Sequence, residues 1–363
     1  MATVEIMRSI GSAAAGRARH ALPAMAIVLL CAVSAFAQSP AAAGPGATTD
    51  KTIPVAKGSR LTVSNDAGEV VIKTWNQDSL RVRASHSDRA SVDIQNAAGV
   101  ISIRSRATHG RATIDYEITA PAWLPIKVSG QFPYIGVEGS QNEVSAETVR
   151  GDIVVKGGSG SVTARSIHGE IIIEDAKGRV SATTVNQGIR IAGTTGEIVA
   201  ETTNGDILLE RIGSGLIDVS TVNGDVRAET TLPAGAKVRV ETHNGDITLV
   251  VPETAGATFT VRTHSGDFYS NLPTKTVGEP RRGRRTIYTL GNGGADVELQ
   301  SFGGTIRLRR PGTASTPGSR GPKDKDKGKL EEHPHEAALP HPPGGGFGTP
   351  LSGSEQPATA VRR

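Results

Sequence analysis

A short repeat of 18 to 21 residues is the feature that most constrains how this chain folds. Seven turns of similar sequence follow one another, and each opens with Ser or Thr three positions before a shared reference position. The reference residues are Gly151, Gly169, Gln187, Gly205, Gly224, Gly245 and Gly266. A fixed period of this length is typical of a solenoid, in which each coil packs only against its neighbours.

The residues on both sides of each turn alternate between apolar and polar. An apolar residue stands two positions after the reference residue, and another stands seven positions before it. The first set is Ile153, Ile171, Ile189, Ile207, Val226, Ile247 and Phe268, and the second is Val144, Val162, Val180, Ile198, Ile217, Val238 and Phe259. Period-two alternation predicts two short strands per coil, stacked at the strand spacing of about 4.8 Å. Five positions before the reference, Ala in the first four coils becomes Val in the last three, which predicts a wider C-terminal cross-section.

These patterns predict an all-β fold, a single-stranded β-solenoid or β-helix of 18–21-residue coils, which we expect to be right-handed. A meander of antiparallel hairpins is the main alternative, because Asn-Gly-Asp turns also suit hairpins. Apolar residues of matched size at whole-coil intervals favour the solenoid. We expect the turn glycines to provide positive φ. We also expect the Ser or Thr hydroxyl to bond the turn backbone or the next coil.

The sequence divides into a signal peptide, a linker, an N-terminal β-strand region that caps the solenoid, the repeats, and a disordered tail. The corresponding ranges are 1–37, 38–52, 53–140, 141–310 with an insertion at 271–296, and 311–363. The tail is rich in Pro, Gly, Lys and Ser and lacks apolar residues that could pack. Aromatic residues concentrate in the cap, where we expect them to form its core or, alternatively, a glycan platform. They are Trp75, Trp123, Phe132 and Tyr134.

The N-terminus has the features of a secretory signal. Basic residues precede an apolar run at 22–33, and Ala35-Phe36-Ala37 fits the small-x-small rule for cleavage before Gln38. Cys31 is the only cysteine, and the large Leu30 before it disfavours lipidation. If Cys31 leaves with the signal, the mature chain has no disulfide. We therefore expect export to the periplasm, the envelope or the medium, with no transmembrane span in the mature chain.

The net charge of +4 is mild for a chain of 363 residues. Basic residues gather at 281–285 and at 307–310. Such patches suit lipopolysaccharide, anionic lipid or nucleic acid, but a solvated loop is the simpler interpretation. Aromatic residues make up 3% of the chain and do not interleave with the basic runs, so no nucleic-acid partner is expected.

Polar residues in the turns are candidates for metal ligands, although turn stabilisation is the simpler role. Calcium needs several oxygens at one point, and six of the seven turns carry one acid each, which forms a ladder: Asp152, Glu170, Asp206, Asp225, Asp246 and Asp267. His243 and His264 occupy the same place in successive coils, so we expect them within one rung of each other, as exposed turn residues or as part of a metal site. Three tail histidines suggest at most loose metal binding: His333, His335 and His341. We predict no catalytic, cofactor-binding or metal-binding residues.

Three segments resemble the DUF4097 family of β-strand-repeat, adhesin-like proteins. They are residues 61–72 (LTVSNDAGEVVI) followed by Trp75, the Ala120-Pro121 pair, and the run of Thr-x-Asn-Gly-Asp turns. The resemblance covers roughly residues 53–310 and implies an exported or envelope-associated β-solenoid. It implies no catalytic residues, because the family has none established.

We therefore predict a non-enzymatic exported cell-envelope or secreted β-solenoid with an adhesin-like binding or structural role. The expected partner is an unknown protein, peptide or glycan of the cell envelope, and no cofactor is expected. Outward apolar residues on one strand row suggest a contact stripe: Val154, Ile172, Leu208 and Tyr269. The alternatives are a polysaccharide-processing β-helix enzyme, marked by a cleft with clustered carboxylates and Arg, and a calcium-stabilised surface module.

Overall fold

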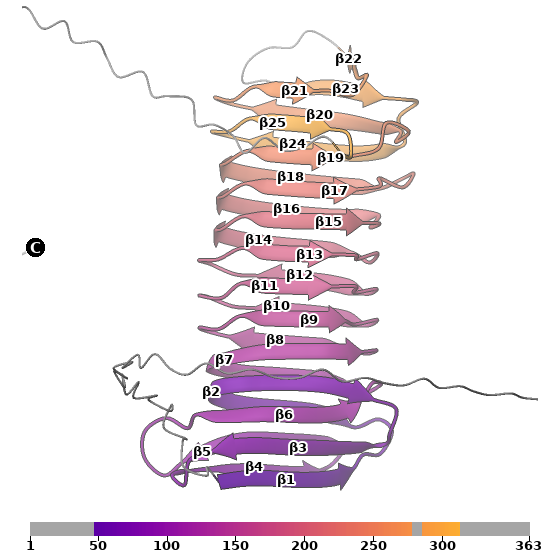
Figure 1. Ribbon diagram of the computed structural model, residues 1–363. Coiled ribbons are helices and arrows are strands. Elements are labelled where there is room, and N and C mark those ends of the chain that lie inside the picture. The colour runs from indigo at the N-terminus through magenta and orange to yellow at the C-terminus, as the bar shows by residue number, and fades with distance from the viewer. Residues whose placement is uncertain (1–46, 278–284, 313–363) are drawn as a thin grey trace, which may run out of the picture. The chain divides into compact units, whose positions relative to one another are not determined.

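The computed structural model describes residues 47–277 and 285–312, all of which belong to one compact unit. These residues form 25 β-strands and no helix, and each coil stacks on the next as a solenoid (Figure 1). The predicted all-β solenoid is therefore confirmed. Its right-handed winding stays a prediction.

Each coil contributes one strand to each of two parallel faces. Along face 1 run β8 (Val144–Thr148), β10 (Ser161–Arg165), β12 (Arg179–Thr183), β14 (Ile198–Asn204), β16 (Leu216–Asn223) and β18 (Lys237–Asn244). Along face 2 run β9 (Ile153–Gly157), β11 (Ile171–Glu174), β13 (Ile189–Ala192), β15 (Ile207–Ile212), β17 (Val226–Thr230) and β19 (Ile247–Val250). Because neighbours on each face are parallel and one full coil apart, the hairpin meander is excluded.

The register stacks like residues on like residues. Ile153, Ile171, Ile189 and Ile207 pair in one ladder, and all four are buried. Their outward neighbours stay partly or fully exposed, as period-two alternation requires. A single thin core thus runs through the coils, and it is mostly Ile, Val, Leu and Ala.

The N-terminal end is stacked out of chain order. β2 (Arg60–Trp75) turns a corner and pairs in parallel with β5 (Val100–Ala107) and β6 (Ile114–Pro121) on one side and with β7 (Ile126–Ser140) on the other. Antiparallel strands close this end, with β4 (Ala90–Ala97) on β5, β3 (Ser79–His86) on β6 and β1 (Ala47–Pro54) on β3. β1 starts inside the segment 38–52 that we expected to be a linker, so residues 47–52 belong to the folded unit.

The C-terminal end is also stacked out of chain order. β24 (Ala295–Ser301) lies between β18 and β20 (Ala257–Thr263), and β25 (Ile306–Arg309) lies between β19 and β21 (Phe268–Ser270). The coil that is last in sequence is therefore second to last in space. The expected insertion 271–296 holds β22 (Lys275–Val277) and β23 (Thr286–Leu290); β23 pairs antiparallel with β20, and β22 pairs antiparallel with β23.

The aromatic residues of the cap do not form its core. Trp75, Trp123, Phe132 and Tyr134 are all partly exposed, and only Trp123 packs against the buried cluster. Trp123 donates from Nε1 to Asp78, and the Lys57 ammonium lies over its ring. These contacts hold the loops that carry Asp78 and Lys57 against the outer surface of the cap. The aliphatic interior of the cap instead contains Tyr116, which the sequence did not single out.

Close packing between coils is what the turn glycines share, and Gly151, with a φ of 149°, is the one turn glycine that also has a positive φ. Gly205, Gly224 and Gly245 do not have positive φ, contrary to our expectation. A Cβ added to Gly224 would lie 2.0 Å from the carbonyl oxygen of Gly205 in the coil below, and Gly245 meets Gly224 at 1.9 Å. The turns therefore touch backbone to backbone, and any side chain would force adjacent coils apart.

The Ser and Thr hydroxyls that open the turns bond the neighbouring coil, as predicted. Thr184 Oγ1 donates to the carbonyl oxygen of Gly169 at 3.1 Å, and Thr221 Oγ1 donates to that of Gly205 at 3.0 Å. The same bond recurs up the stack, with donors Ser166, Thr202, Thr242 and Ser301. These buried hydroxyls fix the stacking of consecutive turns.

Candidate functional site

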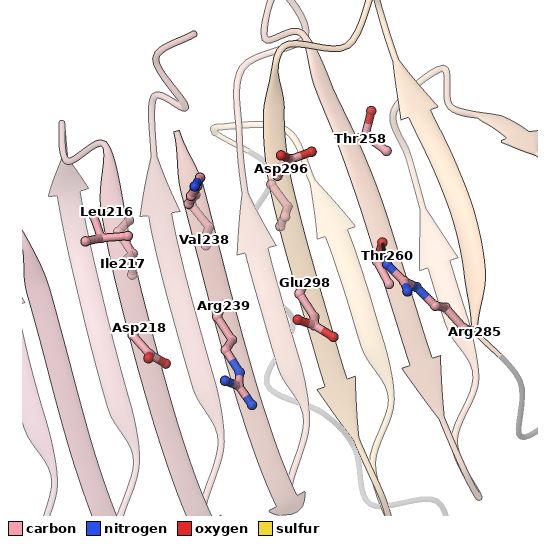
Figure 2. A pocket seen from close by; sticks show the side chains of 12 residues that line it. Leu216, Ile217, Asp218, Val238, Arg239, Thr258, Thr260, Arg285, Asp296 and Glu298 are labelled. Carbon is pink, nitrogen blue, oxygen red and sulfur yellow. Dashed lines mark hydrogen bonds between the residues drawn. The ribbon is translucent and has the colours of Figure 1, made fainter. Parts of the chain in front are cut away.

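A shallow groove of about 470 Å³ crosses the outside of face 1 near the C-terminal end (Figure 2). Its floor is β16, β18, β24 and β20, whose residues Ile217, Val238 and Val297 point into the core. Their neighbours along each strand must then point outward. Because β24 lies between β18 and β20 and supplies part of this floor, the groove depends on the position of β24.

Two rows of outward side chains line this groove. The register gives one row as Leu216, Lys237, Asp296 and Thr258, and the other as Asp218, Arg239, Glu298 and Thr260. Acidic, basic, hydroxyl and apolar groups thus alternate at one strand spacing, about 4.8 Å. Such a surface suits a polar ligand that spans several coils.

Arg239 is the centre of the charged row. It donates from Nε and Nη2 to one oxygen of Glu241, at 3.1 and 2.8 Å. This hydrogen-bonded pair raises the pKa of Arg239 above its usual value, and the Asp218 and Glu298 carboxylates on either side add to the rise. Arg239 therefore stays charged and holds its place in the groove.

Three carboxylates of the groove have no fixed partner within residues 47–277 and 285–312. Asp218, Asp296 and Glu298 are exposed, and none of them forms a hydrogen bond or close ion pair there. Arg285 is the only residue of the basic run 281–285 that the structure describes, and its Nη2 donates to Thr260 Oγ1 at 3.2 Å. The groove thus offers free acceptors beside an anchored donor (Figure 2).

The acidic turn ladder holds the coils together. Oδ1 of Asp206 accepts from the backbone N–H of Asp225, and Oδ1 of Asp225 accepts from that of Asp246, each at 2.8 Å. Asp152 and Asp246 bond the next coil in the same way, and Asp246 also pairs with Arg307. In the described part of the chain, no three His, Cys, Asp or Glu residues gather as metal ligands would.

An asparagine ladder runs beside the acids, and sequence reasoning missed it. The side-chain amides of Asn204, Asn223 and Asn244 each donate to the asparagine amide oxygen one coil below, at 2.9 to 3.3 Å, and Asn186 is the first acceptor. The signal was present, because the residue before the turn glycine is Asn in successive coils.

His243 and His264 are not neighbours, because the ring of Phe302 lies between them. Phe302 stacks on His243 at 4.7 Å and on His264 at 4.5 Å between ring centroids, with the planes within 7° of parallel. Both histidines come from coils adjacent in sequence, but the β24–β25 coil separates them. The expectation that they lie within one rung is wrong, and the pair cannot share a metal ion.

The expected apolar stripe is interrupted. Arg190 pairs in register between Ile172 and Leu208, and three polar residues separate Leu208 from Tyr269. Exposed apolar residues gather instead at the corner after the Ser or Thr of each turn: Val149, Ile167, Val222 and Phe302.

Several residues singled out in the sequence lie outside the described part of the chain. These are Cys31, Arg281, Arg282, Arg284, His333, His335 and His341. Within the described residues, no helix is long and apolar enough to cross a membrane.

Comparisons with known proteins give a family and a set of distant structural neighbours. A candidate adhesin from Bacteroides fragilis is 10% identical, with a TM-score of 0.38, over 72% of this chain and 97% of its own. A candidate adhesin from Parabacteroides merdae is 12% identical, with a TM-score of 0.36, over 73% of this chain and 97% of its own. A candidate lipid-binding protein from Parabacteroides distasonis is 10% identical, with a TM-score of 0.32, over 73% of this chain and 95% of its own. The comparison with curated proteins found no match.

The family assignment rests on the family model and not on these neighbours. The model described as Toastrack DUF4097 matches residues 58–309, which is most of the chain. The match begins at Gly58, two residues before β2, and ends with β25, so it includes the interleaved parallel strands of both ends but not β1. The chain belongs to the DUF4097, or Toastrack, family.

Proposed function

We propose that this protein is a non-enzymatic, exported solenoid of the cell envelope or the surrounding medium, with an adhesin-like binding role. Its ligand is an extended polar molecule, a peptide or a glycan, that lies across the outside of face 1. The secretory features of the first 37 residues support export. A stack of rigid coils with a regular outer face supports binding over several coils.

The groove of Figure 2 is the observation that carries this proposal. Asp218, Asp296 and Glu298 offer unpaired acceptors, while Arg239 and Arg285 offer donors that are already anchored. A ligand would replace water on groups that need little rearrangement, and this lowers the entropic cost of binding.

The test is a screen of the full chain against glycan and peptide arrays, followed by affinity measurement for the best ligand. The double variant Asp218→Asn, Glu298→Gln removes the two free charges beside Arg239 and is expected to weaken binding at least tenfold. Glu201→Gln is the matched control, because Glu201 is exposed on β14 of the same face and lies outside the groove. Equal binding by the double variant and the control would refute the groove as the site.

A second candidate function is polysaccharide cleavage, and the carboxylates beside Arg239 favour it. Asp218 and Glu298 stand on strands two spacings apart, about 9.5 Å, which is wider than the roughly 5–5.5 Å of a retaining glycosidase pair and at the upper end of the roughly 6.5–9.5 Å of an inverting pair. Both carboxylates are exposed on the open face of the sheet, which gives them no enclosed cleft around a scissile bond. Release of reducing ends from a polysaccharide, lost in the same double variant, would establish this alternative and overturn the non-enzymatic proposal.

A further inference from the structure

The last rung of face 2 contains a second hollow, of about 400 Å³, which is separate from the groove on face 1. It lies between β21, at the end of the stack in Figure 1, and β25. Tyr269, Ser270, Asn271, Arg307, Leu308 and Arg309 line it. Two of these six residues are cationic and none is acidic, unlike the mixed lining of the groove.

The arginines around this hollow are held in different ways. Arg307 forms an ion pair with Asp246, and Arg310 forms one with Glu253. Arg309 is half-exposed and has no ion pair within residues 47–277 and 285–312. The nearby acids are therefore already engaged, and the guanidinium of Arg309 is the cation left to bind an external anion.

Asn271 is fixed as a hydrogen-bond donor to the hollow. Its Oδ1 accepts from the backbone N–H of Arg310 at 3.1 Å, and its carbonyl oxygen accepts from the Arg310 guanidinium at 3.0 and 3.1 Å. With the oxygen of the amide used in this way, the Nδ2 group retains its donor hydrogens. Ser270 gives no free hydroxyl, because its Oγ bonds Leu272 in both directions.

Tyr269 supplies an aromatic wall. Its side chain is 59% exposed, the highest value among the large apolar residues of the described chain. It pairs in register with Arg307, and β21 has a strand partner only on the β25 side in the described residues. An aromatic ring with an apolar face and a wet hydroxyl edge suits the face of a sugar ring.

We propose that this hollow binds a saccharide that carries an anionic group. The sugar ring packs against Tyr269, and the carboxylate or phosphate accepts hydrogen bonds from Arg309 and Asn271. A guanidinium is suited to both anions, since its forked N–H groups match two oxygens at once. The excess of donors over acceptors in the lining is what selects an anionic saccharide over a neutral one.

The test is isothermal titration calorimetry of the full chain with three probes. Trigalacturonic acid offers carboxylates, its methyl ester offers the same rings without charge, and glucose 6-phosphate offers a phosphate. We expect an anionic probe to bind and the methyl ester not to bind. Arg309→Gln and Tyr269→Ala should each weaken binding at least tenfold, and raised salt should weaken it in the parent protein.

Arg262→Gln is the matched control, because Arg262 is exposed on β20 of the same terminal coil but lies outside the hollow. It should leave the affinity unchanged, and circular dichroism should show that all variants are folded. Binding of glucose 6-phosphate in place of the uronate, with the same pattern of variants, supports the site and identifies phosphate as the anion. The proposed site is overturned if neither anionic probe binds, or if the methyl ester binds as tightly as the acid. It is also overturned if Arg262→Gln loses as much affinity as Arg309→Gln. The groove variant Asp218→Asn, Glu298→Gln should bind the probe normally, which separates this site from the proposed function.

Discussion

Gly224→Ala tests the claim that the turn glycines are required by contact between coils. The new Cβ would lie 2.0 Å from the carbonyl oxygen of Gly205 and 2.5 Å from its carbon, whereas real Cβ contacts stay beyond 3.0 Å. Because both partners are backbone, no side chain can move aside. The two turns must separate by about 1 Å, which weakens every bond that joins them.

The magnitude follows from the bonds at this junction. Four hydrogen bonds join the two turns: Thr221 Oγ1 to Gly205, Gly205 N to Asn223, Asp225 N to Asp206, and Asn223 to Asn204. At about 0.5–1.5 kcal/mol net for each bond, losing most of them costs about 2–4 kcal/mol. Replacing Gly by Ala also restricts the unfolded chain, which returns about 0.4–1 kcal/mol. The net loss of stability should be about 1–3 kcal/mol.

Gly215→Ala provides the control for that experiment. Gly215 has no positive φ, and a Cβ there would meet nothing within 4 Å. The unfolded-state effect is the same in both variants, so the difference in unfolding free energy isolates the clash. Urea denaturation followed by circular dichroism should show Gly215→Ala at least as stable as the parent and Gly224→Ala less stable than Gly215→Ala by about 2–4 kcal/mol. Equal midpoints for the two variants would refute the contact argument.

Three further predictions concern the core, the turns and the cap. Ile207→Ala opens a cavity in the buried ladder and should lower the unfolding free energy by about 2–5 kcal/mol. Leu208→Ala, on the outward side of the same strand, should lower it by less than about 1 kcal/mol. Similar losses in the two variants would contradict the register. Chelation with EDTA should leave the melting temperature unchanged, because backbone N–H groups satisfy the turn acids, and a clear drop would revive the calcium-stabilised module. Burial raises the pKa of Tyr116 above its usual 10.0, and its hydroxyl has no hydrogen-bond partner among the residues that the structure describes. The parent should therefore keep its stability below about pH 10 and lose part of it above that pH. Tyr116→Phe should remove this alkaline loss without lowering stability at pH 7, and an unchanged alkaline loss would show that another group is responsible.

The repeat pattern predicted the strand ladders because burial acts on each coil in the same way. Ile153, Ile171 and Ile189 could be aligned by their distance from the turn alone. The pattern could not predict the spatial order at the ends, because any coil with the same template can pair in parallel with any other. β24 pairs in register with both β18 and β20, so the repeat template alone does not place it between them.

The wrong predictions about the candidate sites have two causes. The repeat does not give the spatial order of the coils at the ends, and a single turn does not show its contacts with the next coil. The sequence places His243 and His264 in adjacent coils, and nothing in the repeat indicates that Phe302, from a later coil, lies between them. The groove escaped notice for the same reason, because Asp218, Arg239 and Glu298 come together only after the last coil is inserted. The turn glycines were expected to provide positive φ, but the contact that most of them share is with the neighbouring coil, which a single turn does not reveal.

Disulfide trapping across the inserted coil tests the central claim most directly, since this coil builds the groove. Arg239 and Glu298 are in-register neighbours on β18 and β24, and Thr260 lies one strand further, on β20. In a Cys31→Ser background, mild oxidation should cross-link the pair Arg239→Cys with Glu298→Cys, because the Cα atoms stand about 4.8 Å apart and a disulfide spans 4.4–6.8 Å. The pair Arg239→Cys with Thr260→Cys should stay reduced. Cross-linking of the second pair and not the first would place β20 directly on β18, and it would contradict both the stacking order and the groove.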